Sequence, residues 1–126
     1  MRKKRFLAVY LGSEAAFEKA GWNKVSEAAR KELEQKGIKA WEEWGAKHAQ
    51  SIVEQGTPLG KTKRIGRAGI SNVRNAMTAY TVVEADSHEA AAKLFENHPH
   101  FTIFPGEGVE LMECLDLAEV LAKANT

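Results

Sequence analysis

Two short segments of the chain are apolar on both of their alternating faces, and this pattern restricts the fold more than any other feature. The segments are residues 6–11 (FLAVYL) and 77–83 (MTAYTVV). Successive side chains of a β-strand point to opposite faces of its sheet, so a strand of this kind has both faces covered. We therefore predict two strands in the interior of a sheet.

Length and composition indicate a single domain, residues 1–126, with one core, because 44% of the residues are hydrophobic. The 18 basic and 17 acidic residues nearly cancel, which argues against nucleic acid or membrane as a partner. The apolar run after the basic residues 2–5 is too short for a signal peptide, and no stretch is long enough to span a membrane. A single cysteine, Cys114, excludes an internal disulfide and favours a cytoplasmic location.

Helical patterns fill most of residues 13–55. Ser13 is predicted to cap a short helix that ends at Gly21, and a charged helical run covers residues 26–35. Gly37 either separates this run from the next or lies within one long helix. The next run has an apolar face formed by Trp41, Trp44, Gly45, His48 and Ile52. Gly45 on this face indicates a close approach of the helix backbone to what it covers.

The second half of the chain contains further strands and a helix. Residues 61–67 are predicted to form an exposed second strand, and residues 109–115 alternate as a half-buried fourth strand, followed by a helical tail over residues 116–124. Between the third and fourth strands, Asp86 and Glu89 have the spacing of a capping box. The apolar face of the helix that follows is Ala91, Leu94 and Phe95, then His98, and Pro99 is predicted to end this helix.

The predicted order is β-α-β-β-α-β with an extra helical insert at about residues 13–36, which is the ferredoxin-like α+β plan of a four-stranded antiparallel sheet. The inner strands of that plan are the first and third, the two with apolar residues on both faces. Helices cover one face of such a sheet, so the other needs a second cover. We predict a homodimer packed through its sheet faces, with the insert or the tail as alternative covers.

Three histidines are the candidate catalytic residues. His48 lies on an apolar helical face and is either a core histidine or a general acid or base. His98 and His100 cluster at a helix exit, where a helix C-terminus would favour a charged imidazolium at His98. An alternative is a metal site of these histidines with Glu107 or Glu110, but the spacing is non-specific. We predict no metal and no cofactor.

The candidate ligand contacts are Trp44, Lys61, Arg64 and Tyr80. Trp44 is otherwise a core residue. Residues 61–67 carry a basic cluster that either protects an edge strand from aggregation or captures an anionic ligand. The preceding glycines, Gly56 and Gly60, do not form a phosphate loop, because three residues rather than four separate them and a helix rather than a strand precedes them.

The chain resembles the YCII-related proteins, small bacterial domains of the dimeric α+β barrel type. The resemblance rests on the strand order and on residues 47–56 (KHAQSIVEQG), 84–101 (EADSHEAAAKLFENHPHF) and 110–115 (ELMECL). It implies an active site in which a histidine of the first crossover helix pairs with the aspartate of an Asp-Pro step. His48 matches the histidine, whereas His98-Pro99 stands in place of Asp-Pro.

These observations lead to an expected function. We expect a small cofactor-free enzyme that binds a small organic molecule, with His48 as base, His98 as acid or anion contact and His100 in support. The reaction would be an isomerisation, elimination or hydrolysis. The alternatives are a non-catalytic ligand-binding or regulatory dimer that uses the same cleft, and a purely structural dimer with inert histidines.

Overall fold

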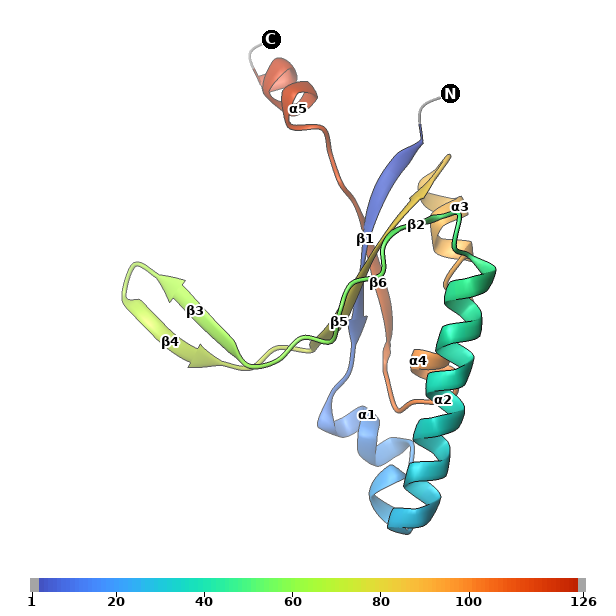
Figure 1. Ribbon diagram of the computed structural model, residues 1–126. Helices are drawn as coiled ribbons and strands as arrows, with labels where there is room; N and C mark the ends of the chain where they lie inside the picture. Colours follow the sequence, from blue (N-terminus) through green and yellow to red (C-terminus); the bar gives the residue numbers. More distant parts are fainter. Residues whose placement is uncertain (1–2, 125–126) are drawn as a thin grey trace.

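The computed structural model, described here for residues 3–124, is built on a four-stranded antiparallel sheet (Figure 1). The strands lie in the order β2-β5-β1-β6 and are β1 (Lys4–Leu11), β2 (Ile52–Glu54), β5 (Met77–Ala85) and β6 (Gly108–Glu113). The two segments that are apolar on both faces, β1 and β5, are the central pair, as predicted. Leu7 pairs with Val82 on one side and with Met112 on the other, which puts these three side chains on a common face.

The helical elements are α1 (Glu14–Lys19), the 3-10 turn η1 (Trp22–Lys24), α2 (Glu27–Lys47), α3 (His88–Lys93), α4 (Pro99–Thr102) and α5 (Leu117–Ala124). Ser13 caps α1 by accepting a hydrogen bond from the Ala16 amide, as predicted. Of the two interpretations of Gly37, the structure shows one long helix, because α2 runs through this glycine without a break. No helix within residues 3–124 is both long enough and apolar enough to cross a membrane.

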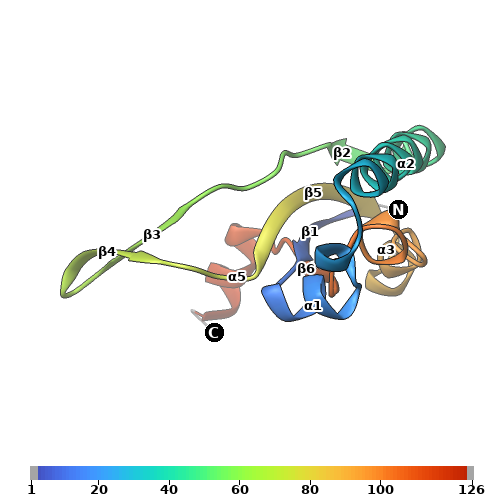
Figure 2. The same cartoon turned by 90° about the horizontal axis from the view of Figure 1, so that it is seen from below.

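The core lies between one face of the sheet and the helices α2 and α3. Its buried side chains alternate along the central strands and meet the helices above them; they are Phe6, Ala8, Tyr10, Trp44, Val83, Ala91 and Phe95. On the opposite face Leu7 and Val82 are only half-buried, and 43% of Met112 is exposed. One face of the sheet is therefore packed and the other is open (Figure 2).

The predicted exposed strand at residues 61–67 exists, but its place as the second strand of the four-stranded sheet is wrong. The strand that joins the sheet next to β5 is β2, which begins at Ile52, a residue that the sequence placed on a helix. Residues 61–67 instead contain β3 (Thr62–Gly66), which pairs with β4 (Gly69–Val73) in a separate hairpin. The short apolar segment after α2 can pack against the core, whereas the cation-rich segment has too few apolar side chains to take that place and pairs locally across a two-residue turn.

Three local expectations also need correction. Ser87, not Asp86, caps α3, accepting a hydrogen bond from the Ala90 amide in the ordinary N-cap geometry. Pro99 begins α4 rather than ending α3, because the missing amide of proline is tolerated in the first helical turn. The close backbone approach in α2 occurs at Gly37 and not at Gly45, as a Cβ on Gly37 would overlap the ring of Phe104.

Candidate functional site

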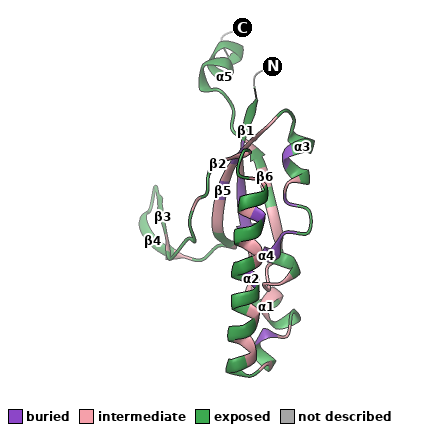
Figure 3. Ribbon diagram, turned by 45° about the vertical axis from the view of Figure 1, so that its right-hand side comes forward, coloured by how far each residue is buried: buried purple, intermediate pink, exposed green. Residues whose placement is uncertain are grey.

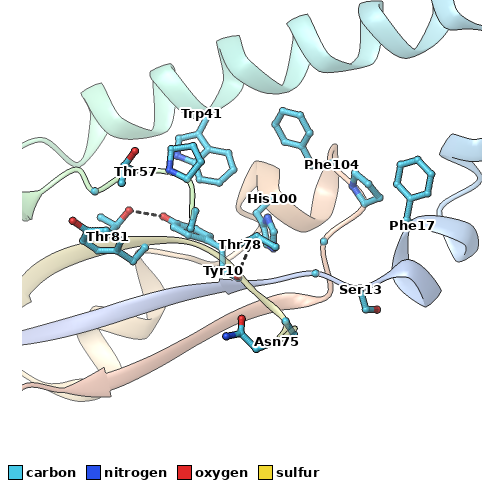
Figure 4. Close-up of a pocket in the computed structure, with 18 of the residues that line it drawn as sticks. Tyr10, Ser13, Phe17, Trp41, Thr57, Asn75, Thr78, Thr81, His100 and Phe104 are labelled. Atoms are coloured by element: carbon cyan, nitrogen blue, oxygen red, sulfur yellow. Dashed lines mark hydrogen bonds between the residues drawn. The ribbon is translucent and has the colours of Figure 1, made fainter. Parts of the chain in front are cut away.

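A cavity of about 1220 Å³ lies between α2 and the edge of the packed sheet face (Figure 4). Trp41 of α2 and Phe104 of the segment after α4 form its aromatic roof, and Phe17 of α1 adds to one wall. Tyr10 of β1 and His100 of α4 lie across from them. Because most of the lining is apolar and a few polar groups project among it, the cavity has the character of a small-molecule site.

The Tyr10 hydroxyl forms part of a buried hydrogen-bond chain. Thr81 Oγ1 donates to the carbonyl of Gln55 at 3.0 Å, so its single proton is used there. The Tyr10 hydroxyl, 3.0 Å from Thr81 Oγ1, is therefore the donor in that pair. Burial raises the pKa of Tyr10 to about 12, against the opposing effect of the Thr81 hydrogen bond. Tyr10 thus stays protonated at neutral pH and carries a directed O–H group.

His100 brings an imidazole to the same cavity. Its Nε2 lies 2.6 Å from the carbonyl oxygen of Leu11. A carbonyl can only accept, so Nε2 carries the proton and Nδ1 keeps its lone pair. Burial lowers the pKa of His100, although the hydrogen bond to Leu11 acts in the opposite direction. Gly106 packs on this ring, since a Cβ there would overlap His100 Nε2.

His98 lies behind His100 and is fully buried. Its Nδ1 accepts the backbone N–H of His100 at 3.0 Å, so the proton of its neutral ring sits on Nε2. Within residues 3–124 that Nε2 has no hydrogen-bond partner. Aromatic rings surround the imidazole, with centroid distances of 4.4 Å to Trp41, 4.6 Å to Trp44 and 5.1 Å to Tyr10.

The expectation of a charged imidazolium at His98 is wrong. Burial, with smaller effects of the nearby His100 and His48, lowers the pKa of His98 to about 3. The residue also precedes α4 as its N-cap instead of ending α3, so no helix C-terminus favours its positive charge. His98 is therefore a neutral residue at physiological pH.

His48 occupies a different place from the other two predicted catalytic residues. It is the C-cap of α2, is half-buried and contacts Trp44 at a ring distance of 5.4 Å. Burial and then the neighbouring Lys47 lower its pKa. His48 and His98 both contact the Trp44 indole, but neither lines the cavity, whereas His100 does.

Of the four predicted ligand contacts, one lines the cavity and three do not. Tyr80 lines the cavity and donates from its hydroxyl to Glu54 Oε1 at 2.7 Å. Trp44 belongs to the core, where its indole N–H donates to the carbonyl of Leu94 at 2.7 Å. Lys61 lies at the base of the β3–β4 hairpin and Arg64 on β3, and both are exposed and outside this cavity.

The sequence interpretation missed Tyr10 and Thr81 as site residues. A signal was available, because a hydroxyl on each of two strands that are otherwise apolar needs a buried partner. Their pairing depends on the register of β1 against β5, which places Thr81 opposite Ala8, two residues from Tyr10. The alternative of a metal site is not supported, since residues 3–124 contain no cluster of three or more potential metal ligands.

Comparisons with known proteins place the fold. No protein-family model matches the chain, and no curated protein matches its sequence. The structure is similar to 5-chloro-2-hydroxyhydroquinone dehydrochlorinase (TftG) from Burkholderia phenoliruptrix, solved in complex with 2,5-dihydroxybenzoquinone. This similarity has a TM-score of 0.52 and 12% identity, and covers 91% of this chain and 97% of that one.

The fold is a ferredoxin-like α+β fold. A second similar structure is 30S ribosomal protein S6 from Thermotoga maritima, with a TM-score of 0.45 and 12% identity over 99% of this chain and 100% of that one. At such identities the likeness describes the arrangement of strands and helices, and the chemistry of the site has to be argued from its own residues.

Proposed function

We propose that the chain is a small cofactor-free enzyme that holds a flat, largely apolar organic molecule bearing hydroxyl or carbonyl groups and moves a proton with His100. The observation that carries this proposal is the tautomer of His100. Its Nε2–H is held by the Leu11 carbonyl, which leaves the Nδ1 lone pair as the proton acceptor of a neutral imidazole beside the cavity.

The walls and the polar groups of the cavity support this substrate class. Trp41 and Phe104 offer aromatic surface for stacking against a flat ring. The Tyr10 hydroxyl, kept protonated by its raised pKa, would donate to a substrate oxygen in exchange for its bond to Thr81. A base and a hydrogen-bond donor beside one cavity suit proton abstraction followed by isomerisation or by loss of a leaving group.

The geometry supports a different division of roles from the one expected from sequence. His98 would act as a positioning residue, because its Nδ1 accepts the backbone N–H of His100 and its ring is held in an aromatic enclosure. A neutral His98 has no proton to release near pH 7 as a cationic acid. His48 would act on the site only through Trp44.

The comparison with TftG is consistent with this proposal. That protein is named for a dehydrochlorination of a hydroxylated aromatic compound, and its structure contains a dihydroxybenzoquinone. Elimination of a leaving group from a phenolic ring needs a base and no redox cofactor, which matches the groups at this cavity. We also propose kinship with the YCII-related proteins, on the sequence segments quoted above and this fold.

A second candidate function is ligand binding without turnover. It is favoured by the surroundings of the histidines, because within residues 3–124 no carboxylate bonds to the ring of His48, His98 or His100. A carboxylate commonly orients and charges a catalytic imidazole. Without one, the same cavity would serve as the sensor site of a regulatory dimer.

The test uses two probes, 2,5-dihydroxybenzoquinone for binding and 5-chloro-2-hydroxyhydroquinone for turnover. Binding is followed by calorimetry and turnover by chloride release, in the wild type and in His100→Gln. The matched control is His88→Gln, since His88 Nε2 also contacts a backbone carbonyl, that of Leu111 at 2.9 Å, but does not line the cavity.

We expect the wild type to bind and to release chloride, with release about 100-fold slower in His100→Gln and unchanged in His88→Gln, because a general base contributes on the order of 100-fold or more. Binding without chloride release in the wild type would support the ligand-binding function for this probe class. Equal turnover in His100→Gln and the wild type would reject His100 as the base.

A further inference from the structure

Two elements extend away from the packed body of the molecule, the hairpin β3–β4 and the helix α5 (Figure 3). Each carries a cluster of exposed apolar side chains. On the hairpin, Ile65 and Ile70 are cross-strand partners and are 75% and 72% exposed. On α5, Leu117, Val120 and Leu121 recur at helical spacing and are also exposed. Both elements thus present apolar surface that nothing in the described chain covers.

Neither element is of a kind that is stable in water on its own. A lone two-stranded hairpin is marginally stable, because it lacks a third strand or a helix to bury its apolar side chains. A helix of eight residues is also well below the length at which isolated helices persist. Tertiary packing supplies most of the stability of such elements, so a partner surface is required for both.

The two elements have opposite charge. Residues 61–74, which span the hairpin, contain five basic residues and no acidic one; they are Lys61, Lys63, Arg64, Arg67 and Arg74. Residues 107–124, which span β6 and α5, contain five acidic residues against one basic residue; the acidic ones are Glu107, Glu110, Glu113, Asp116 and Glu119. The two elements therefore carry charges of opposite sign, as expected for two surfaces that recognise each other.

Within one protomer the tip of the hairpin and α5 lie at separate places, both on the side of the molecule away from α2 (Figures 1 and 2). The open face of the sheet, with Leu7, Val82 and Met112, belongs to the same side. In a dimer with two-fold symmetry every contact between the copies occurs twice. If the hairpin of the first copy contacts α5 of the second, the hairpin of the second copy therefore contacts α5 of the first.

We propose that the β3–β4 hairpin of one copy docks on β6 and α5 of a second copy. The chain then forms a homodimer in which each hairpin contacts the other copy. Ile65 and Ile70 pack against Leu117, Val120 and Leu121 of the second copy. Lys63, on the same face of the hairpin as Ile65, and Arg67 of the turn face the acidic residues of its β6 and α5. This contact is separate from the cavity, so its failure in a test leaves the proposed chemistry untouched.

The test is a charge exchange on the full-length protein. One variant carries Lys63→Glu and Arg67→Glu on the hairpin, a second carries Glu110→Lys and Glu119→Lys on β6 and α5, and a third combines all four changes. Glu113 and Asp116 are left unchanged because Glu113 pairs with Lys4 and Asp116 caps α5. Light scattering coupled to size exclusion gives the mass, and a dilution series gives the dimer dissociation constant.

We expect a dimeric wild type whose dissociation constant rises with salt, and a rise of about tenfold or more in each two-site variant, because like charges then face each other. The four-site variant should recover the wild-type value, since opposite charges meet again. A monomeric wild type, an unchanged constant in both two-site variants, or no recovery in the four-site variant would each overturn the proposal. Loss of oligonucleotide binding in Lys63→Glu/Arg67→Glu at unchanged mass would assign the hairpin to a nucleic acid instead.

Discussion

Burial controls the protonation of the ionisable side chains beside the cavity. Tyr10 and His98 are fully buried and His100 nearly so, and desolvation disfavours the charged form of each. The tyrosine therefore keeps its proton and the two histidines stay neutral. The cavity therefore receives a neutral O–H donor from Tyr10 and one neutral imidazole from His100, with the neutral His98 behind them.

The pH dependence of stability should reveal His98. The folded chain has a His98 pKa of about 3 against an ordinary value of 6.5, so between these values the unfolded state binds an additional proton. Stability is then greatest above pH 6.5 and falls by up to about 1.4 kcal/mol per pH unit as the pH decreases toward 3. The measurement is urea unfolding over a range of pH in the wild type and in His98→Asn, which keeps an N-cap side chain but removes the titrating ring. The free energy of unfolding should depend less steeply on pH in the variant.

The control for this prediction is His88→Asn, which also removes one imidazole but from an exposed position. In this variant the free energy of unfolding should depend on pH nearly as steeply as in the wild type. Parallel pH profiles for the wild type and His98→Asn would mean that the buried imidazole accepts a proton in the folded state, contrary to the structure.

The Tyr10 hydroxyl should contribute modestly to stability. In Tyr10→Phe the Thr81 hydroxyl still donates to the Gln55 carbonyl, so no buried donor is left without a partner. We expect a loss of about 1 kcal/mol in the free energy of unfolding, the usual net value of one hydrogen bond. Tyr80→Phe, which removes a solvent-accessible hydroxyl bonded to Glu54, should change it by less than about 0.5 kcal/mol. A larger effect at Tyr80 than at Tyr10 would contradict this ranking.

At the scale of elements, α2 is shaped by what packs on it. A glycine in the middle of a helix costs about 1 kcal/mol relative to alanine. At Gly37 the cost is offset by packing, because the missing Cβ lets the Phe104 ring approach the helix backbone and form the roof of the cavity. Gly56 has a comparable role after β2, since with φ at 76° its Cβ would overlap the Tyr80 carbonyl.

The two glycines of α2 should respond in opposite directions to alanine. Gly37→Ala should destabilise the chain by about 1 to 3 kcal/mol, because the new Cβ overlaps the Phe104 ring and overpacking has this cost. Gly45→Ala places its Cβ no closer than 3.4 Å to the Gln55 side chain and should stabilise the helix by up to about 1 kcal/mol. Thermal and urea unfolding measure both, and a stabilised Gly37→Ala would show that Phe104 can move aside at little cost.

At the scale of the whole molecule, the sheet has one packed and one open face. Helices over the first face bury the core, while Leu7, Val82 and Met112 on the other remain partly accessible. A contiguous apolar strip across three neighbouring strands is a typical protein interface. This arrangement is the reason for the sheet-to-sheet homodimer that we propose. The hairpin of each copy would add a second contact, to α5 of the other copy.

A charge placed on the open face should separate such a dimer. Met112, which is 43% exposed, lies next to Leu7 of the central strand, and Met112→Glu would bury a carboxylate between two sheets. We expect a monomeric mass by light scattering with unchanged circular dichroism. Phe101→Glu, on α4 and 38% exposed, is the matched control on the helical side and should keep the wild-type mass. A dimer that survives Met112→Glu would exclude the sheet face as the interface.

The sequence pattern predicted the sheet more completely than the site. The strands at β1, β5 and β6, the inner position of the first two, the cap at Ser13 and the terminal helix all follow from local periodicity and turn chemistry. The second strand was misplaced because β2 is only three residues long. So short a strand leaves no alternation to detect, whereas residues 61–67 have a stronger local β pattern.

The sequence by itself determined which segments form the central strands and the helices, since alternation and helical spacing are properties of consecutive residues. Only the tertiary structure decided which side chains share the cavity. Tyr10, Thr81 and His100 come from three separate segments, and their meeting depends on strand register and on where α4 turns back against β1. The tautomer of His100 is likewise set by a carbonyl 89 positions away, a contact that no local pattern encodes.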